Sequence, residues 1–182
     1  MYLSAVRHLH VSAGLHDHFS LQLTPRLQQV LRGIKKRQAL THPPTIRLPI
    51  TLQIMCQIKE VLSQEPQSYN NIMLWAACCI AFFGFLWVGE FTVPGPDDYD
   101  KSSHLSLADI SVDSRTNPSL LKVTIKQSKT DPFRMGVNIY LGATDRPICP
   151  VVGILPYLAV RGNLAGPLFI TEDGKGLTRQ FF

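Results

Sequence analysis

Basic side chains are the residues of this sequence that most clearly suggest a chemical role, because they gather in one part of it. Residues 1–49 contain seven Lys or Arg and a single acid, Asp17. Residues 50–182 contain eleven Lys or Arg and twelve acids. A polyanion such as nucleic acid would therefore meet the first quarter of the chain first. A solvated basic helix face is the alternative interpretation of the same charges.

Histidines and cysteines raise the questions of metal binding and disulfides. The histidines form two His-x-His pairs, His8 with His10 and His16 with His18, but a zinc site needs convergent ligands that this spacing alone does not supply. No Cys-x-x-Cys pair occurs among Cys56, Cys78, Cys79 and Cys149, which argues against a zinc knuckle or a disulfide framework. We expect no metal and no other cofactor. The N-terminus lacks the apolar run of a secretory signal, so we expect a nuclear or cytoplasmic protein that is not secreted.

The elements that carry the basic residues are predicted to be two helices. Residues 2–13 have helical spacing and end at Gly14. Thr24 is placed to cap a second helix, with Pro25 in its first turn. Three prolines then mark residues 41–49 as an extended linker. The expected division is a helical piece at 1–40, the linker at 41–49 and a second domain at 50–182.

The second domain is predicted to begin with a helix capped by Thr51 that runs to Leu62, with Ile54, Ile58 and Val61 facing inward. The uncharged run at 72–89 follows. Its eighteen residues reach the lower limit of a membrane span. We favour a central buried helix, because Gly84 interrupts the run, Glu90 closes it and the rest of the sequence is typical of a soluble chain.

Beyond Pro94 the apolar residues alternate, which predicts strands. A short strand is expected at 104–112, and strands around Leu121–Ile125 and Met135–Leu141 form a β-hairpin with a loop at 127–134. A helix is expected from Pro150 to Val160, a strand at 168–170, a turn at 173–174 and a helix start at Leu177. The fold class is therefore α+β, mainly helical, with a three-stranded antiparallel sheet.

Three motifs now coincide. Residues 81–91 (AFFGFLWVGEF) end the buried helix, residues 126–131 (KQSKTD) lie in the hairpin loop, and residues 166–169 (GPLF) precede a turn and Leu177-Thr178-Arg179. In this order and spacing they resemble the tyrosine recombinase/integrase family, in particular its retrotransposon- and crypton-like eukaryotic branch. The resemblance spans almost the whole chain, including SAVRHL near its beginning and the helix that contains RGIKK. It implies a partial core-binding domain that clamps DNA, followed by the N-terminal part of a recombinase catalytic domain.

The family's reaction explains which residues to look for. A tyrosine hydroxyl attacks a DNA phosphodiester, two arginines and a His or Trp stabilise the charge on the phosphate, and a hairpin lysine protonates the leaving oxygen. By this resemblance, Lys129 occupies the position of the hairpin lysine and is a vestigial acid for the leaving group. Glu90 occupies the position of a glutamate that supports the structure in the family. At the first arginine position stands Trp87, whose single neutral N–H cannot clamp a phosphate as a guanidinium does. We expect Trp87 to be a core aromatic.

The remaining catalytic residues have no counterpart in this sequence. The family's His-x-x-Arg box and nucleophilic tyrosine are expected after the Leu177 helix, whereas the last histidine is His104 and the sequence ends at Phe182. Tyr140 and Tyr157 do not occupy the nucleophile's place. The resemblance therefore implies a truncated, mobile-element-derived recombinase that is catalytically inactive.

DNA and protein are the partners that the resemblance implies. Weak backbone contacts with double-stranded DNA are expected from eight basic residues: Arg7, Arg32, Lys35, Lys36, Arg37, Lys126, Lys129 and Arg134. Missing C-terminal helices would leave an apolar surface exposed, which favours a protein partner or self-association. The alternative function is a domesticated protein-interaction scaffold without DNA activity. No membrane association is expected.

Overall fold

A computed structural model describes residues 2–15, 25–41, 48–66, 68–128, 131, 133 and 135–182. The chain divides into two units, Met1–Leu48 and Pro49–Phe182. The described residues form six α-helices and a three-stranded antiparallel sheet, so the predicted α+β class with such a sheet is confirmed.

The first unit contains helices α1 (Tyr2–Ser12) and α2 (Pro25–Thr41). Leu27, Val30, Leu31 and Ile34 follow i, i+3, i+4, i+7 spacing along α2 and form one apolar stripe. Val30 and Ile34 on this stripe are exposed.

The second unit begins with α3 (Leu52–Leu62) and α4 (Tyr69–Gly84). Thr51 caps α3 as expected, since its hydroxyl accepts a hydrogen bond from the Ile54 N–H at 3.3 Å. The predicted inward face of α3 is wrong in part. Ile54 and Val61 are exposed, because α3 turns Met55 toward α4 and buries it there beside Cys79.

The apolar run is a buried helix over only part of its predicted length. Five residues of α4 are fully buried: Met73, Ala76, Ala77, Cys79 and Ile80. The helix ends at Gly84, and Phe85 adopts a left-handed conformation with φ +51°. The short helix α5 (Val88–Phe91) follows. Among the described residues, no helix combines the length and the apolarity that crossing a bilayer requires.

The sheet has the order β1 (Ile110–Val112), β2 (Leu120–Ile125), β3 (Val137–Gly142). Strands β2 and β3 pair from Leu120 with Gly142 to Ile125 with Val137, which forms the expected hairpin. The strand predicted at 104–112 is shorter, because Ser106 and Asp109 close the 3-10 turn η1 (Leu107–Asp109) before β1. Met135 is exposed outside β3, because Gly136 (φ +69°) bends the chain before the strand.

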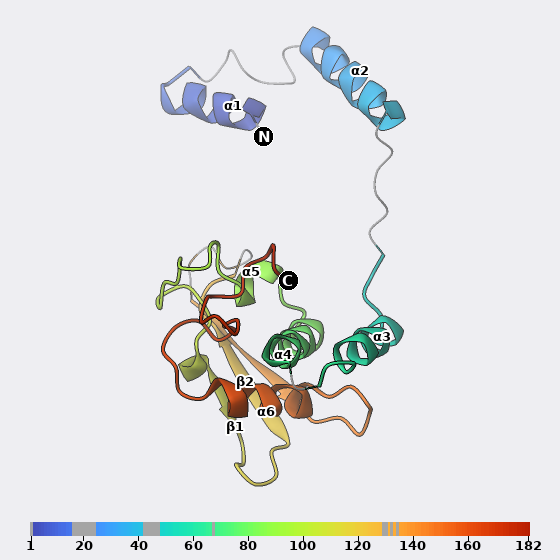
Figure 1. Ribbon diagram of the computed structural model, residues 1–182. Helices are drawn as coiled ribbons and strands as arrows, with labels where there is room; N and C mark the ends of the chain where they lie inside the picture. The colour runs from blue at the N-terminus through green and yellow to red at the C-terminus, as the bar shows by residue number, and fades with distance from the viewer. Residues whose placement is uncertain are drawn as a thin grey trace. The chain divides into compact units, whose positions relative to one another are not determined.

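The core lies between the sheet and the two helices α4 and α6 (Pro150–Arg161), as Figure 1 shows. Buried side chains of β2, Leu121, Val123 and Ile125, alternate with more exposed ones. The segment at 168–170 is buried, but in place of the predicted strand it has a single isolated bridge, between Ile170 and Gly176. A turn at 179–181 replaces the predicted helix after Leu177.

Arg161 is a buried charge at the end of α6, with a relative exposure of 1%. Its guanidinium donates to four backbone carbonyl groups, at 2.7 Å to Leu168 and Pro167, 2.9 Å to Leu164 and 3.3 Å to Gly162. The planar fork of five N–H donors suits this set of acceptors. Arg161 thereby holds the loop that follows α6 against the helix.

Candidate nucleic-acid interface

The sequence-predicted site residues lie in three places: the β2–β3 hairpin, the α4–α5 connection and the N-terminal helices. Two of them, Lys129 and Arg134, lie outside the described residues. The base of the hairpin is described. It borders a polar hollow of about 350 Å³, lined by Ser102, Thr124, Ile125, Lys126, Met135, Gly136, Val137 and Asn138.

A hydrogen bond between Gly136 and Asp131 holds the chain just before β3. The Gly136 N–H donates to Asp131 Oδ2 at 2.8 Å. A Cβ on Gly136 would lie 3.0 Å from the Ile125 carbonyl oxygen, and its positive φ also disfavours other residues. On the strands just below, Thr124 Oγ1 donates to Asn138 Oδ1 at 2.8 Å. These contacts give the loop that carries Lys129 a defined base.

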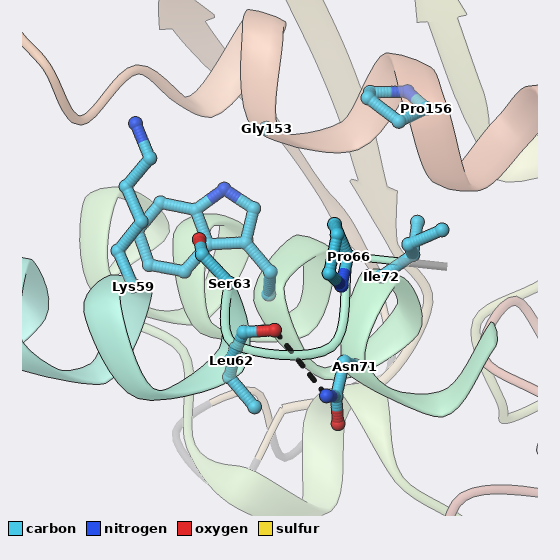
Figure 2. Close-up of a pocket in the computed structure, with 9 residues that line it drawn as sticks. Lys59, Leu62, Ser63, Pro66, Asn71, Ile72, Gly153 and Pro156 are labelled. Atoms are coloured by element: carbon cyan, nitrogen blue, oxygen red, sulfur yellow. Dashed lines mark hydrogen bonds between the residues drawn. The ribbon is translucent and has the colours of Figure 1, made fainter. Parts of the chain in front are cut away.

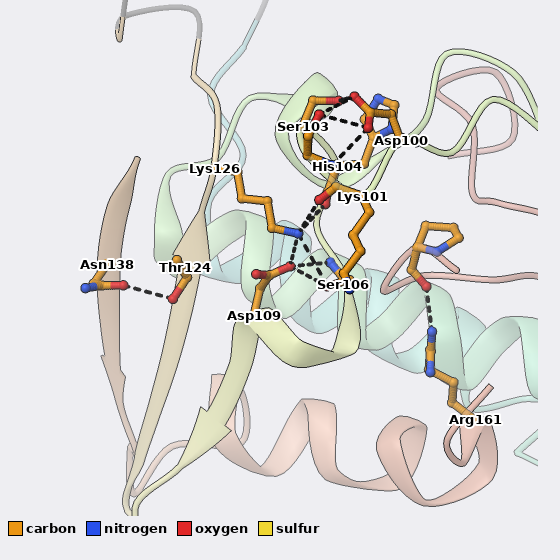
Figure 3. Close-up of polar contacts among 12 residues, drawn as sticks. Asp100, Lys101, Ser103, His104, Ser106, Asp109, Thr124, Lys126, Asn138 and Arg161 are labelled. Carbon is orange, nitrogen blue, oxygen red and sulfur yellow. Dashed lines mark hydrogen bonds and ion pairs between the residues drawn. The ribbon is translucent and has the colours of Figure 1, made fainter. Parts of the chain in front are cut away.

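Lys126 is bound within the chain (Figure 3). Its Nζ lies 2.6 Å from Asp109 Oδ2 and donates to the carbonyl oxygens of Lys101 at 2.9 Å and His104 at 3.0 Å. The Ser106 hydroxyl lies 3.4 Å away. An ammonium has three protons, so these acceptors occupy its donors, and Asp109 balances its charge. The lysine predicted as a DNA contact is thus part of an intrachain group, which we call the Lys126 cluster.

The sequence did not indicate Asp109 as Lys126's partner. The only local signal was the Ser106-x-x-Asp109 spacing, which is typical of a capping box. The Asp109 carboxylate does accept from the Ser106 N–H at 2.8 Å. That spacing predicts the turn, but the pairing with Lys126 depends on β1 lying beside β2.

Trp87 and Glu90 lie where the chain leaves α4. The Glu90 carboxylate accepts a hydrogen bond from the Trp87 N–H at 2.8 Å, at the start of α5. Trp87 is 57% exposed, so the expectation of a core aromatic is wrong. The physical reason is Phe85, whose left-handed conformation ends the helix and removes Trp87 from its buried face. Phe85 is itself 91% exposed.

The basic helix α2 presents its charges to solvent. Its sequence contains no acid, and its five cationic residues are all exposed: Arg26, Arg32, Lys35, Lys36 and Arg37. Arg26 was not among the predicted contacts, although it shares the helix. Arg7 lies within α1, but its side chain is outside the described residues.

The two tyrosines considered as nucleophiles differ in environment. Tyr157 is buried; its hydroxyl donates to the Leu168 carbonyl and accepts from the Ile170 N–H, both at 2.9 Å. Burial raises the pKa of the Tyr157 phenol above its ordinary value. Tyr140 is exposed on β3. A buried phenol held by two backbone groups is a packing residue and is not placed to attack a phosphate.

Metal ligands do not converge in the described part of the chain, where no group of three or more His, Cys, Asp or Glu side chains is placed to hold an ion. His16 and His18 of the second His-x-His pair lie outside the described residues.

Comparison with known proteins returns no match, either to a protein-family model or to a curated protein.

Proposed function

We propose that this chain is a degenerate member of the tyrosine recombinase family that binds the backbone of double-stranded DNA without cutting it. The observation that carries the DNA proposal is α2, with five exposed cations and no acid over seventeen residues. Such a surface attracts phosphates and reads little sequence. The Lys126 cluster is left out of the proposed contact surface, because its ammonium is already neutralised by Asp109.

The proposed loss of catalysis is supported by Trp87. Trp87 is more than half exposed at the start of α5, yet an indole offers one neutral donor where the family's arginine would offer a charged fork. Incubation with a nicked suicide DNA substrate should therefore give no covalent protein–DNA adduct on a denaturing gel. An adduct would overturn the claim of inactivity.

DNA binding is tested by fluorescence anisotropy with a labelled duplex of about 30 base pairs. If all five cations of α2 contact phosphates, the affinity should fall about 500-fold between 50 and 200 mM salt. The triple variant Lys35→Gln, Lys36→Gln, Arg37→Gln removes three of these five cations, so it should lower the slope of log affinity against log salt by about three fifths.

The matched control removes three exposed charges elsewhere, in the variant Lys101→Gln, Arg115→Gln, Lys175→Gln. It should bind with the wild-type salt dependence. Equal losses in both triple variants would mean that net charge, and not α2, determines binding.

A second candidate function is self-association as a scaffold, favoured by an apolar hollow of about 490 Å³. Residues from α3, α4, α5 and the C-terminal turn line it, none of them charged: Ile50, Met55, Ile58, Leu62, Leu74, Cys78, Ala81, Phe82, Leu86, Val88, Phe91 and Phe182. The exposed Phe85 adjoins lining residue Leu86, so one copy offers both a projecting aromatic ring and a hollow to a second copy.

Sedimentation velocity tests this candidate. The wild type should show a concentration-dependent dimer that Phe85→Asp disrupts, whereas Phe133→Asp, at another exposed aromatic, should leave it intact. A monomer at all concentrations up to about 100 µM would reject a scaffold formed by this surface.

A further inference from the structure

A second, smaller pocket lies between α3, α4 and α6, and none of its lining residues belongs to the candidate nucleic-acid interface. Its volume is about 170 Å³, and nine residues line it: Lys59, Leu62, Ser63, Pro66, Asn71, Ile72, Trp75, Gly153 and Pro156. Figure 2 shows Lys59 on one side of it, Pro66 and Ile72 on the other, and Gly153 and Pro156 of α6 across it. A cavity of about 150 Å³ is large enough to hold a benzene ring.

The walls of this pocket are fixed by contacts among its own residues. Asn71 Nδ2 donates to the Leu62 carbonyl at 3.2 Å, which ties the start of α4 to the end of α3. Gly153 allows α6 to approach closely, since a Cβ there would lie 2.6 Å from Cys79 Sγ. The pocket is therefore built by the packing of three helices, together with Ser63 and Pro66 of the short connection between α3 and α4.

One end of the pocket is cationic. Lys59 Nζ donates to the Pro147 carbonyl at 2.7 Å and lies 5.8 Å from the centre of the Trp75 ring. Among the described residues, Lys59 has no carboxylate partner within 4.0 Å. An ammonium carries three donors, so hydrogen-bonding capacity and an unbalanced positive charge remain at this end.

A neutral donor lies beside the cation. Trp75 lines the pocket, and its Nε1 is near the position that a Gly153 Cβ would occupy, 3.4 Å from it. No hydrogen bond to this indole N–H is formed by the described residues. Prolines and aliphatic side chains supply the remaining wall, at Leu62, Pro66, Ile72 and Pro156.

We propose that this pocket binds a small carboxylic acid whose body is a single aryl ring. The carboxylate accepts from the Lys59 ammonium and the Trp75 indole N–H, and the ring packs against the proline and aliphatic wall. The volume limits the body to about one ring, and the single cation selects a monoanion over a neutral or cationic ligand of the same shape.

Benzoate is the probe, and the ¹H–¹⁵N spectrum of the full chain is the readout. The chain has two tryptophans, so the spectrum contains two indole cross-peaks, which Trp87→Phe assigns. Benzoate should shift the Trp75 cross-peak to saturation in the millimolar range and leave the exposed Trp87 cross-peak in place. Absence of a saturable shift at 50 mM benzoate would overturn the proposal.

Charge recognition is tested first without mutation, by replacing benzoate with the isosteric neutral benzamide, which should bind at least about tenfold more weakly. Lys59→Met keeps the aliphatic stem and should weaken benzoate by a similar factor, whereas Lys101→Met, at an exposed lysine outside the pocket, should not. N-acetylphenylalanine distinguishes a free small acid from a peptide terminus and should bind more weakly than benzoate. Equal binding of benzoate and benzamide would show that the cation does not select the ligand.

Discussion

The ammonium of Lys126 on β2 lies 2.6 Å from the carboxylate of Asp109, which precedes β1. Both side chains are largely buried, and the same ammonium also holds the carbonyls of Lys101 and His104. The pair thus joins the connection before β1 to the strand that leads into the hairpin loop. Lys126 therefore has a structural role at the base of the hairpin.

Lys126→Met should lower the free energy of unfolding by about 2 kcal/mol, because it leaves the Asp109 carboxylate without its cation. Urea denaturation measures this change. In the double variant with Asp109→Asn the loss should be smaller than the sum of the single losses. A wild-type stability combined with weakened DNA binding would instead place this lysine on the DNA.

Phe85→Gly should stabilise the protein by about 0.5–1 kcal/mol. A left-handed conformation costs a residue with a Cβ about 1–2 kcal/mol, and glycine avoids that cost at an entropic expense of about 0.5–1 kcal/mol. Phe85 is almost fully exposed, so little packing is lost. Thermal unfolding of Phe85→Ala is the control, since alanine keeps the Cβ and should not raise the stability. If Phe85→Ala stabilised the protein as much as Phe85→Gly, the left-handed conformation would not be the source of strain.

Tyr157→Phe should lower the free energy of unfolding by about 1–3 kcal/mol, because the Leu168 carbonyl and the Ile170 N–H lose their buried partner. Tyr140→Phe, on the exposed side of β3, removes the same hydroxyl and should change stability by less than about 0.5 kcal/mol. Guanidinium denaturation of both variants gives the comparison, and equal effects would contradict the buried bridge.

Stability should fall as the pH rises above about 9. Burial raises the pKa of the Tyr157 phenol, and burial raises the pKa of the Cys79 thiol to about 12. The unfolded chain loses these protons near their ordinary values while the folded chain keeps them, so each group lowers stability by up to about 1.4 kcal/mol per pH unit.

Urea denaturation from pH 9.5 to 11 in reducing buffer measures this slope. Tyr157→Phe should make it shallower above pH 10, and Tyr140→Phe should not. A slope that is the same in all three proteins would remove Tyr157 as a contributor.

Trp87→Arg should leave the free energy of unfolding within about 0.5 kcal/mol of the wild type, because the indole is more than half exposed. It adds a cation, so it should raise the affinity for duplex DNA modestly, while the suicide substrate should still give no adduct. Thermal unfolding and anisotropy check the two effects. A decrease of more than about 2 kcal/mol in the free energy of unfolding would indicate that Trp87 is a buried core residue.

The sequence predicted most elements of the second unit because their signals are local. Thr51 caps α3, Pro150 begins α6 and the alternation at 121–125 gives β2. It failed where a single residue redirects the chain. Gly84 marked an interruption of the apolar run at 72–89, but the left-handed conformation that ends α4 is adopted by Phe85, a residue type that does not signal it.

The candidate site was less predictable than the fold. Charge counts located α2, because exposed cations on a helix need no tertiary partner. The ion pair of Lys126 was not foreseen, because its partner Asp109 lies seventeen positions away and approaches only through the β1–β2 pairing. The pocket beside Lys59 had no sequence signal, since α3 and α4 precede the sheet in the chain and α6 follows it.

Arg161 has a consequence for how the second unit opens. One side chain supplies the hydrogen bonds of four carbonyl groups in a segment that has no regular structure of its own. Releasing any part of that segment exposes a permanently charged group to an apolar interior. The end of α6 and residues 162–168 should therefore exchange their amide hydrogens as one cooperative unit, at a rate set by global unfolding and not by local fraying.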